Sequence, residues 1–167
     1  RKRLQHIAGR YLLRYLWPEF PSHLIRIADT RKPYIEGESL KFSISHCGNY
    51  AAVVVSSEQR VGIDIELVSE KLLRVKNKFL SDEENSDRIL MAGGLVKLTR
   101  LWSAKEAVFK WYGLGKVDFK ADIKLFPSSD AMICSFGKTG EKVRVVSRIF
   151  DDLVLSWTEK YDEKDES

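Results

Sequence analysis

Two acidic residues, two positions apart, are the sharpest local feature of the sequence that could do chemistry. Residues 61–66 read Val-Gly-Ile-Asp-Ile-Glu, and in a β-strand successive side chains point to opposite faces. Asp64 and Glu66 therefore share one face, and the apolar side chains occupy the other. Two carboxylates on a rigid strand provide half of a site for Mg²⁺, which takes few protein oxygens and completes its octahedron with water and substrate phosphate. The hexapeptide leaves one alternative open, an amphipathic strand whose two acids face solvent.

A second group of reactive residues has the spacing of a helix. Residues 102–110 read Trp-Ser-Ala-Lys-Glu-Ala-Val-Phe-Lys, which puts Glu106 and Lys110 on one helical face with Trp102. An exposed Glu–Lys pair worth about 0.3–0.5 kcal/mol is the alternative interpretation. Beside the acidic strand, however, a third carboxylate and two lysines (Lys105 and Lys110) supply what is needed to hold a metal and a diphosphate together.

A third candidate lies at the end of an expected strand. Residues 42–47 read Phe-Ser-Ile-Ser-His-Cys and lead into Gly48-Asn49. The hydroxyl of Ser45 and the imidazole of His46 fall at this turn, where they could contact phosphate oxygens. A histidine at a strand end is also typical of an ordinary turn, so this alternative stays open.

The periodicity of the sequence predicts the elements that must position these groups. Apolar residues at helical spacing predict a helix over 3–17 and another over about 96–112. A capping box at Ser81 and Glu84 predicts the start of a shorter helix. The hairpin we expect is formed by the first two predicted strands, and the expected fold class is α+β. Alternating segments predict strands over 41–45, 50–56, 60–67, 123–126, 131–136, 143–150 and 153–161.

Length and composition limit the class of protein. A chain of 167 residues holds one domain or two small halves, and 44% hydrophobic with 31% charged residues describes an ordered globular protein. Its apolar stretches are strand-sized, which predicts no membrane partner. Two distant cysteines favour a cytoplasmic location. The net charge of +4 suits an acidic or phosphate-bearing partner and is too small for a dedicated nucleic-acid binder.

Taken in order, the three motifs closely resemble those of the 4′-phosphopantetheinyl transferase superfamily. Residues 31–34 are similar to its Gly-Lys-Pro element, although Arg31 replaces the usual glycine, and Cys47 replaces a frequent serine. Residues 78–84 are similar to the segment between its last two motifs. The resemblance implies a Mg²⁺-dependent enzyme that transfers the 4′-phosphopantetheine arm of coenzyme A to a serine of an apo acyl or peptidyl carrier protein. It also implies release of 3′,5′-ADP.

The resemblance further implies roles for individual residues. Attack on a diphosphate needs charge neutralisation more than covalent catalysis. Asp64, Glu66 and Glu106 would be the Mg²⁺ ligands, and Glu106 the candidate general base for the carrier serine. Together with Lys110, Asp64 and Glu106 would form the catalytic set. Lys110 and His46 would contact the phosphates of coenzyme A, and Lys105 would assist them. Ser45, Lys32 and Pro33 would line the nucleotide pocket. Arg3 and Arg10 would bind the 3′-phosphate, with a solvated helix face as the alternative.

A particular arrangement of halves also follows from the resemblance. Larger members of the family are pseudo-dimers of two pseudo-twofold-related α+β halves, each with a small antiparallel sheet and helices, and coenzyme A lies in the cleft between them. Residues 1–60 would form the first half, 61–162 the second, and 163–167 an acidic tail. If the halves are comparable in length, we expect about 40 N-terminal residues of the native protein to be absent. We expect a monomer whose carrier partner, with an acidic surface, belongs to fatty-acid, polyketide or nonribosomal-peptide synthesis.

Two other functions fit parts of the sequence. The chain could be a catalytically impaired module that binds coenzyme A or the carrier protein without transferring anything. The basic residues between Arg1 and Arg14 could alternatively bind nucleic acid, although only their charge supports this function.

Overall fold

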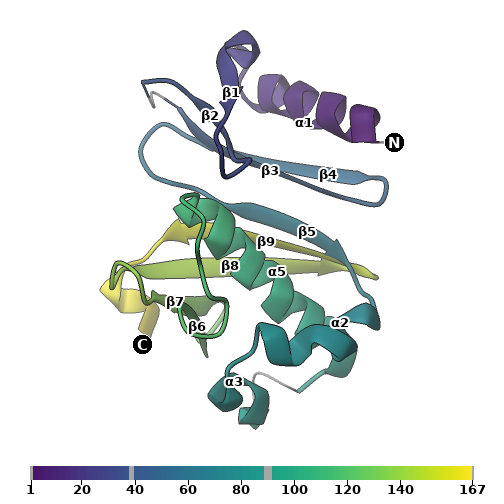
Figure 1. The fold of residues 1–167 in the computed structure, drawn as a ribbon, viewed down its shortest axis with the longest axis vertical. Coiled ribbons are helices and arrows are strands. Elements are labelled where there is room, and N and C mark those ends of the chain that lie inside the picture. The colour runs from purple at the N-terminus through teal and green to yellow at the C-terminus, as the bar shows by residue number, and fades with distance from the viewer. Residues whose placement is uncertain (1, 38–39, 89–91, 167) are drawn as a thin grey trace.

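The chain divides into two parts, one above the other in Figure 1: α1 and strands β1 to β4 above, and the elements from β5 onward below. The computed structural model describes residues 2–37, 40–88 and 92–166. The helices in these ranges are α1 (Lys2–Leu16), α2 (Lys71–Val75), α3 (Asp82–Ser86) and α5 (Gly94–Tyr112), with 3-10 turns at Ser22–Leu24, Lys76–Lys78 and Glu163–Glu166. The strands are β1 (Ile25–Ile27), β2 (Pro33–Ile35), β3 (Lys41–Cys47), β4 (Tyr50–Ser56), β5 (Ile63–Leu67), β6 (Ile123–Pro127), β7 (Met132–Phe136), β8 (Lys142–Phe150) and β9 (Leu153–Lys160).

A five-stranded antiparallel sheet forms the lower part, with the strand order β5-β9-β8-β7-β6. The long helix α5 lies across one face of this sheet (Figure 1), and burial of apolar side chains between the two holds them together. The helix therefore presents its 102–110 motif from a fixed position. Its buried contributions to this core are Leu98, Leu101, Ala104, Val108 and Trp111.

The upper part is built on the hairpin that the sequence predicted. Strands β3 and β4 pair antiparallel around a turn in which Gly48 has a φ of 58°. Helix α1 packs on this hairpin, and a Cβ on Gly9 would lie 2.8 Å from Ile44 Cγ2. A small core of Leu13, Phe20, Ile35 and Phe42 fills the space between them.

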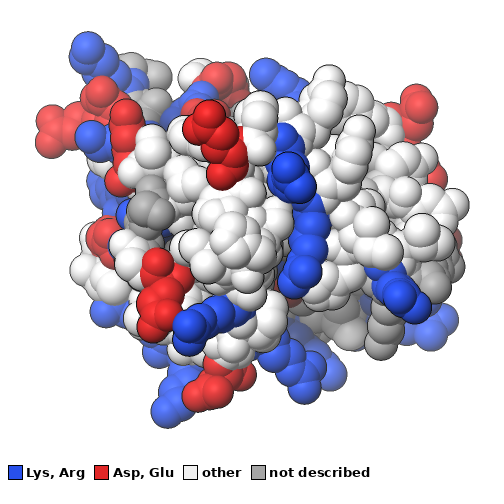
Figure 2. Space-filling view, turned by 90° about the horizontal axis from the view of Figure 1, so that it is seen from above, with Lys and Arg blue, Asp and Glu red and all other residues white. Residues whose placement is uncertain are grey.

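Much of the apolar surface of α1 faces outward. Helical spacing groups four of its side chains, and all four are exposed: Leu4, Ile7, Tyr11 and Tyr15. Seen from above, the molecule shows broad uncharged areas with Lys and Arg side chains running between them (Figure 2). The apolar residues of this helix therefore form a second, exposed face in addition to the face that packs on the hairpin.

The two parts meet where β3 lies beside β5 (Figure 1). These strands belong to separate sheets, and serine side chains join them. The hydroxyl of Ser43 accepts a hydrogen bond from the Ile63 amide at 3.2 Å, and the hydroxyl of Ser45 accepts one from the Ile65 amide at 3.3 Å. Strand β5 thereby receives hydrogen-bond partners from the upper part.

Gly62 allows the start of β5 to approach α5 closely. A Cβ at this position would lie 1.9 Å from the carbonyl oxygen of Ala107 and 2.6 Å from the Trp111 nitrogen. Both are backbone atoms, which cannot move aside as a flexible side chain could. The glycine before Asp64 is therefore required for contact between the strand and the helix.

The expected α+β fold class is confirmed, with small antiparallel sheets and helices in both parts. None of the helices within the described ranges is long and apolar enough to cross a membrane.

Candidate active site

Asp64 lies at the centre of the site, buried on β5. Its Oδ1 atom accepts hydrogen bonds from Lys110 Nζ at 2.7 Å and from Ser45 Oγ at 3.0 Å. The Lys110 ammonium also donates to Ser45 Oγ at 2.8 Å. One carboxylate oxygen thus joins side chains from β3, β5 and α5. The other, Oδ2, is buried and has no hydrogen-bond partner among the described residues.

Glu66, two residues along the strand, has a partner on each oxygen. Trp102 Nε1 donates to Oε1 at 3.2 Å, and Cys47 Sγ donates to Oε2 at 3.6 Å. Burial, followed by the nearby charge of Asp64, raises the pKa of Glu66. Burial also raises the pKa of the Cys47 thiol, which keeps this group protonated as a donor.

Glu106 reaches the same site from α5 and is half-buried. Burial and the charge of Asp64 raise the pKa of Glu106 to about 7, with Lys110 opposing the shift and Glu66 adding to it. Carboxylates this close disfavour one another's ionised form. The three acids therefore form one electrostatic unit that a cation would stabilise.

The donor set fits a magnesium ion that arrives with a phosphate ligand. Within the described ranges no three His, Cys, Asp or Glu side chains are arranged to hold a metal by themselves. Mg²⁺, however, is usually held by one or two carboxylates together with substrate phosphates and water. The unpartnered Oδ2 of Asp64 could supply such a ligand, with Glu66 and Glu106 as its acidic neighbours.

Two neighbouring cavities, of about 180 and 390 Å³, extend from Lys110 along the loop before β2. Lys32 and Pro33 line both cavities, and Lys110 lines the smaller one. The loop is fastened to the end of α5, because Thr30 Oγ1 donates to the Gly113 carbonyl at 3.0 Å and Lys32 Nζ lies 3.5 Å from the Trp111 carbonyl. The structure therefore brings the predicted nucleotide-pocket residues together with Lys110.

The other predicted phosphate contacts have exposed side chains. His46 is exposed, on the face of β3 opposite to Ser45. Arg3 and Arg10 are exposed on α1, in the upper part of the molecule.

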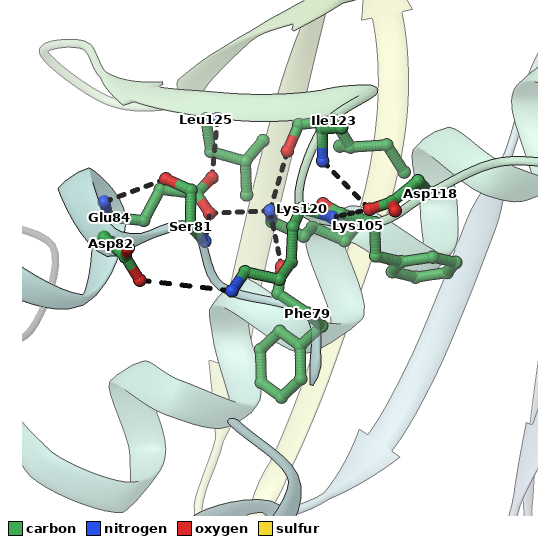
Figure 3. A network of polar contacts seen from close by, with 11 residues as sticks. Phe79, Ser81, Asp82, Glu84, Lys105, Asp118, Lys120, Ile123 and Leu125 are labelled. Atoms are coloured by element: carbon green, nitrogen blue, oxygen red, sulfur yellow. Dashed lines mark hydrogen bonds and ion pairs between the residues drawn. The ribbon is translucent and has the colours of Figure 1, made fainter. Parts of the chain in front are cut away.

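Lys105 is the clearest correction. We expected it to assist in binding phosphate, but its side chain is 0% exposed and its ammonium is occupied by protein oxygens (Figure 3). A group enclosed in this way does not reach a ligand in the cleft, so the prediction is wrong.

Sequence reasoning did not find two partners of Glu66, namely Cys47 and the indole N–H of Trp102. The signal was present in both cases. Cys47 shares a strand face with Ser45, and Trp102 stands one helical turn before Glu106.

Comparison with known proteins gives consistent results. Residues 60–160 match the family described as the 4′-phosphopantetheinyl transferase superfamily. Enterobactin synthase component D of Salmonella austin is 34% identical over 113 residues, which cover 66% of this chain and 47% of the relative. A putative 4′-phosphopantetheinyl transferase of Haemophilus influenzae is 27% identical over 122 residues, 70% of this chain and 52% of the relative. The chain spans about half the length of the curated relatives it matches.

The fold is also found among solved structures. The holo-[acyl-carrier-protein] synthase of Thermotoga maritima superposes with a TM-score of 0.50 at 21% sequence identity. The match covers 62% of this chain and 70% of that protein.

Proposed function

The chain belongs to the 4′-phosphopantetheinyl transferase superfamily, and on that premise we propose that it transfers the 4′-phosphopantetheine arm of coenzyme A to a serine of an apo carrier protein. The reaction would require Mg²⁺ and release 3′,5′-ADP. One observation carries the proposal: Asp64, Glu66, Glu106 and Lys110 converge where β3, β5 and α5 meet, beside a cleft lined by Lys32 and Pro33.

The proposed reaction breaks a phosphoanhydride bond of coenzyme A and forms a phosphoester bond to the carrier. The serine oxygen of the carrier bonds to the phosphorus that bears the pantetheine arm, and the bond from that phosphorus to the 3′,5′-ADP oxygen breaks. Glu106 accepts the serine proton, directly or through a water. Lys110 donates hydrogen bonds to the diphosphate as its charge shifts to the leaving group.

Asp64, Glu66 and Glu106 would hold the Mg²⁺. When bound, the ion supplies positive charge that neutralises the diphosphate oxygens during transfer. Lys32, Pro33 and Ser45 would hold the nucleotide. Phosphate contacts by His46, Arg3 and Arg10 remain predictions, and Lys105 is no longer among them.

The carrier surface we propose is acidic. The segment after β5 is basic and includes one apolar side chain, Leu73, that is 53% exposed. This combination suits a partner that presents carboxylates around a small apolar patch. The basic residues are Lys71, Arg74, Lys76 and Lys78.

Carrier domains of nonribosomal peptide synthesis are the acceptors we propose first, because a relative is named as a component of enterobactin synthase. Carriers of fatty-acid and polyketide synthesis are the alternatives. A monomeric state, a cytoplasmic location and the lack of nucleic-acid and membrane partners remain predictions.

A panel of apo carrier proteins from these three systems tests the proposal. Each carrier is incubated with the protein, coenzyme A and Mg²⁺, and its mass is measured. The proposal predicts a gain of one phosphopantetheine arm on at least one carrier, and none when its acceptor serine is replaced by alanine. Coenzyme A binding without any mass gain would instead support the impaired binding module. Binding of an oligonucleotide with steep salt dependence, and no response to coenzyme A, would support the nucleic-acid alternative.

A further inference from the structure

Lys105 is the hub of a buried polar network on the side of α5 that faces away from β5. Ser103 and Ala107, one turn apart on the helix, face β5: Ser103 Oγ lies 3.4 Å from the Asp64 carbonyl, and Ala107 meets Gly62. Lys105 stands midway between them in sequence and so points to the opposite side of the helix. Its side chain is 0% exposed.

Four oxygens lie within hydrogen-bonding distance of the Lys105 ammonium, and Figure 3 shows it beside Glu84, Phe79 and Ile123. Its three N–H bonds are shared among Glu84 Oε2, 2.7 Å from Nζ, and three backbone carbonyl oxygens 2.7–2.8 Å from Nζ. These carbonyls come from different segments: Phe79 before α3, Phe119 in the loop after α5, and Ile123 at the start of β6. The ammonium therefore fastens α5 to three other parts of the chain.

Glu84 extends the network beyond the helix. Its Oε2 accepts the Ser81 amide at 2.8 Å in a capping box, and its Oε1 accepts the Leu125 amide at 2.9 Å. One carboxylate thus joins the start of α3, strand β6 and Lys105 (Figure 3). None of the residues that bind Lys105 or Glu84 in this network lines the cleft beside Lys110.

The environment requires the charged form of Lys105. Burial lowers the pKa of this ammonium from its usual value, although the hydrogen bond and charge of Glu84 oppose the shift. All four neighbours are oxygens that accept hydrogen bonds, and a neutral amine would direct its lone pair at one of them. We therefore expect Lys105 to stay charged, with its N–H bonds directed at oxygens of the protein.

We propose that Lys105 is a positioning residue for the transfer reaction: it fixes α5 so that Glu106 and Lys110 stay aligned with Asp64, and it contacts neither coenzyme A nor the carrier. This inference rests on the proposed function. Glu106 is its neighbour on the helix, and Lys110 lies on the same rigid element. Catalytic groups must be held to within about 0.5 Å of their productive positions, so a helix released on one side loses this alignment.

The test replaces both charges together. Lys105→Met alone would leave Glu84 buried without its cation and could unfold the protein, so the variant of choice is Lys105→Met with Glu84→Gln. Lys120→Met is the matched control. Lys120 lies at the rim of the same network, 4.0 Å from Asp82, and its side chain is 40% exposed. Kinetics are measured at a temperature where denaturant titration shows every variant to be folded.

The proposal predicts that kcat of the double variant falls about tenfold or more while KM for coenzyme A stays close to that of the wild type. A crystal structure of the double variant without ligands should show α5 displaced from β5 by more than about 0.5 Å. The control should match the wild type in both measurements. Should the double variant fail to fold, Glu84→Gln alone provides a milder version of the same test.

Two outcomes would overturn the positioning role. A folded double variant with wild-type kcat and an unmoved α5 would mean that the network stabilises the fold without aligning the site. A raised KM for coenzyme A with unchanged kcat would mean that Lys105 contributes to substrate binding. If the wild type itself transfers nothing, the proposed function fails, and the position of α5 in the crystal structure still decides the positioning claim.

Discussion

Lys110 Nζ lies 2.7 Å from Asp64 Oδ1, and this contact joins α5 to β5 at the junction of the two parts of the molecule. Asp64 is almost fully buried, whereas about a quarter of the Lys110 side chain (26%) remains exposed to the cleft. The lysine therefore neutralises a buried carboxylate and still reaches the space where a ligand would bind. The second oxygen of Asp64 is left without a partner in the described part of the chain.

Lys110→Met should lower kcat for carrier modification by about 100-fold or more, because it removes a charged donor from the diphosphate. Steady-state kinetics with an apo carrier measure this change. Lys124→Met, on the exposed outer face of β6, is the control and should leave kcat unchanged. A kcat within a few-fold of the wild type in the Lys110 variant would remove this residue from the catalytic set.

Glu106→Gln should abolish transfer and at the same time stabilise the metal-free protein above neutral pH. The pKa of Glu106 is raised to about 7 in the folded state, so the folded protein holds a proton that the unfolded chain releases near pH 4.5. The stability gained from that proton is complete below pH 4.5 and is lost as pH rises through 7. The glutamine variant avoids this loss, and its advantage should reach about 1–3 kcal/mol above pH 7.

Urea unfolding in the presence of a chelator, from pH 4 to pH 8, measures this difference in the free energy of unfolding. The exposed Glu58→Gln serves as the control, with no expected change. An advantage of Glu106→Gln that is independent of pH would contradict the electrostatic origin assigned to it.

Gly62→Ala should destabilise the protein by about 3 kcal/mol or more, because the added methyl group would overlap the Ala107 carbonyl. Gly140→Ala provides the comparison: its Cβ would meet nothing within 4 Å, and only the φ of 73° opposes it, at about 1–2 kcal/mol. Chemical denaturation of both variants gives the two values. Equal losses would show that β5 and α5 can separate without cost.

Trp102→Phe should raise the Mg²⁺ concentration that gives half-maximal transfer by about 10-fold, because it removes the N–H that orients Glu66. The aromatic packing against Phe79 and Phe119 is kept. Transfer rates measured over a Mg²⁺ titration show the effect. Trp157→Phe is the matched control, since it removes a similar indole hydrogen bond, to Glu159, which is none of the three acids of the site. Superimposable Mg²⁺ curves for Trp102→Phe and the wild type would contradict the orienting role of Trp102.

Side-chain periodicity was enough to predict which of the acidic and basic residues share a face of a strand or helix. Alternation along β5 placed Asp64 and Glu66 together, and helical spacing placed Glu106 with Lys110 on α5. The strand predicted over 41–45 in fact extends to Cys47. Those two extra residues bring the Cys47 thiol to Glu66 and turn His46 to the opposite face.

Contacts between residues far apart in the sequence determine the features that local patterns did not predict. Lys105 stands next to Glu106, and local spacing gives no sign that its ammonium is surrounded by oxygens from residues 79 to 123. Helix α1 is a second example. Its apolar residues have helical periodicity, but Gly9 and Leu13 face the hairpin while Leu4 and Tyr11 are exposed.

The mass of an apo carrier protein after incubation with coenzyme A tests the central claim most directly. The wild-type protein should add one phosphopantetheine arm in the presence of Mg²⁺ and none after chelation. Asp64→Asn, which keeps the size of the side chain and removes its charge, should add none under either condition. Mg²⁺-dependent transfer by Asp64→Asn at the wild-type rate would contradict the assignment of this carboxylate as the centre of the site.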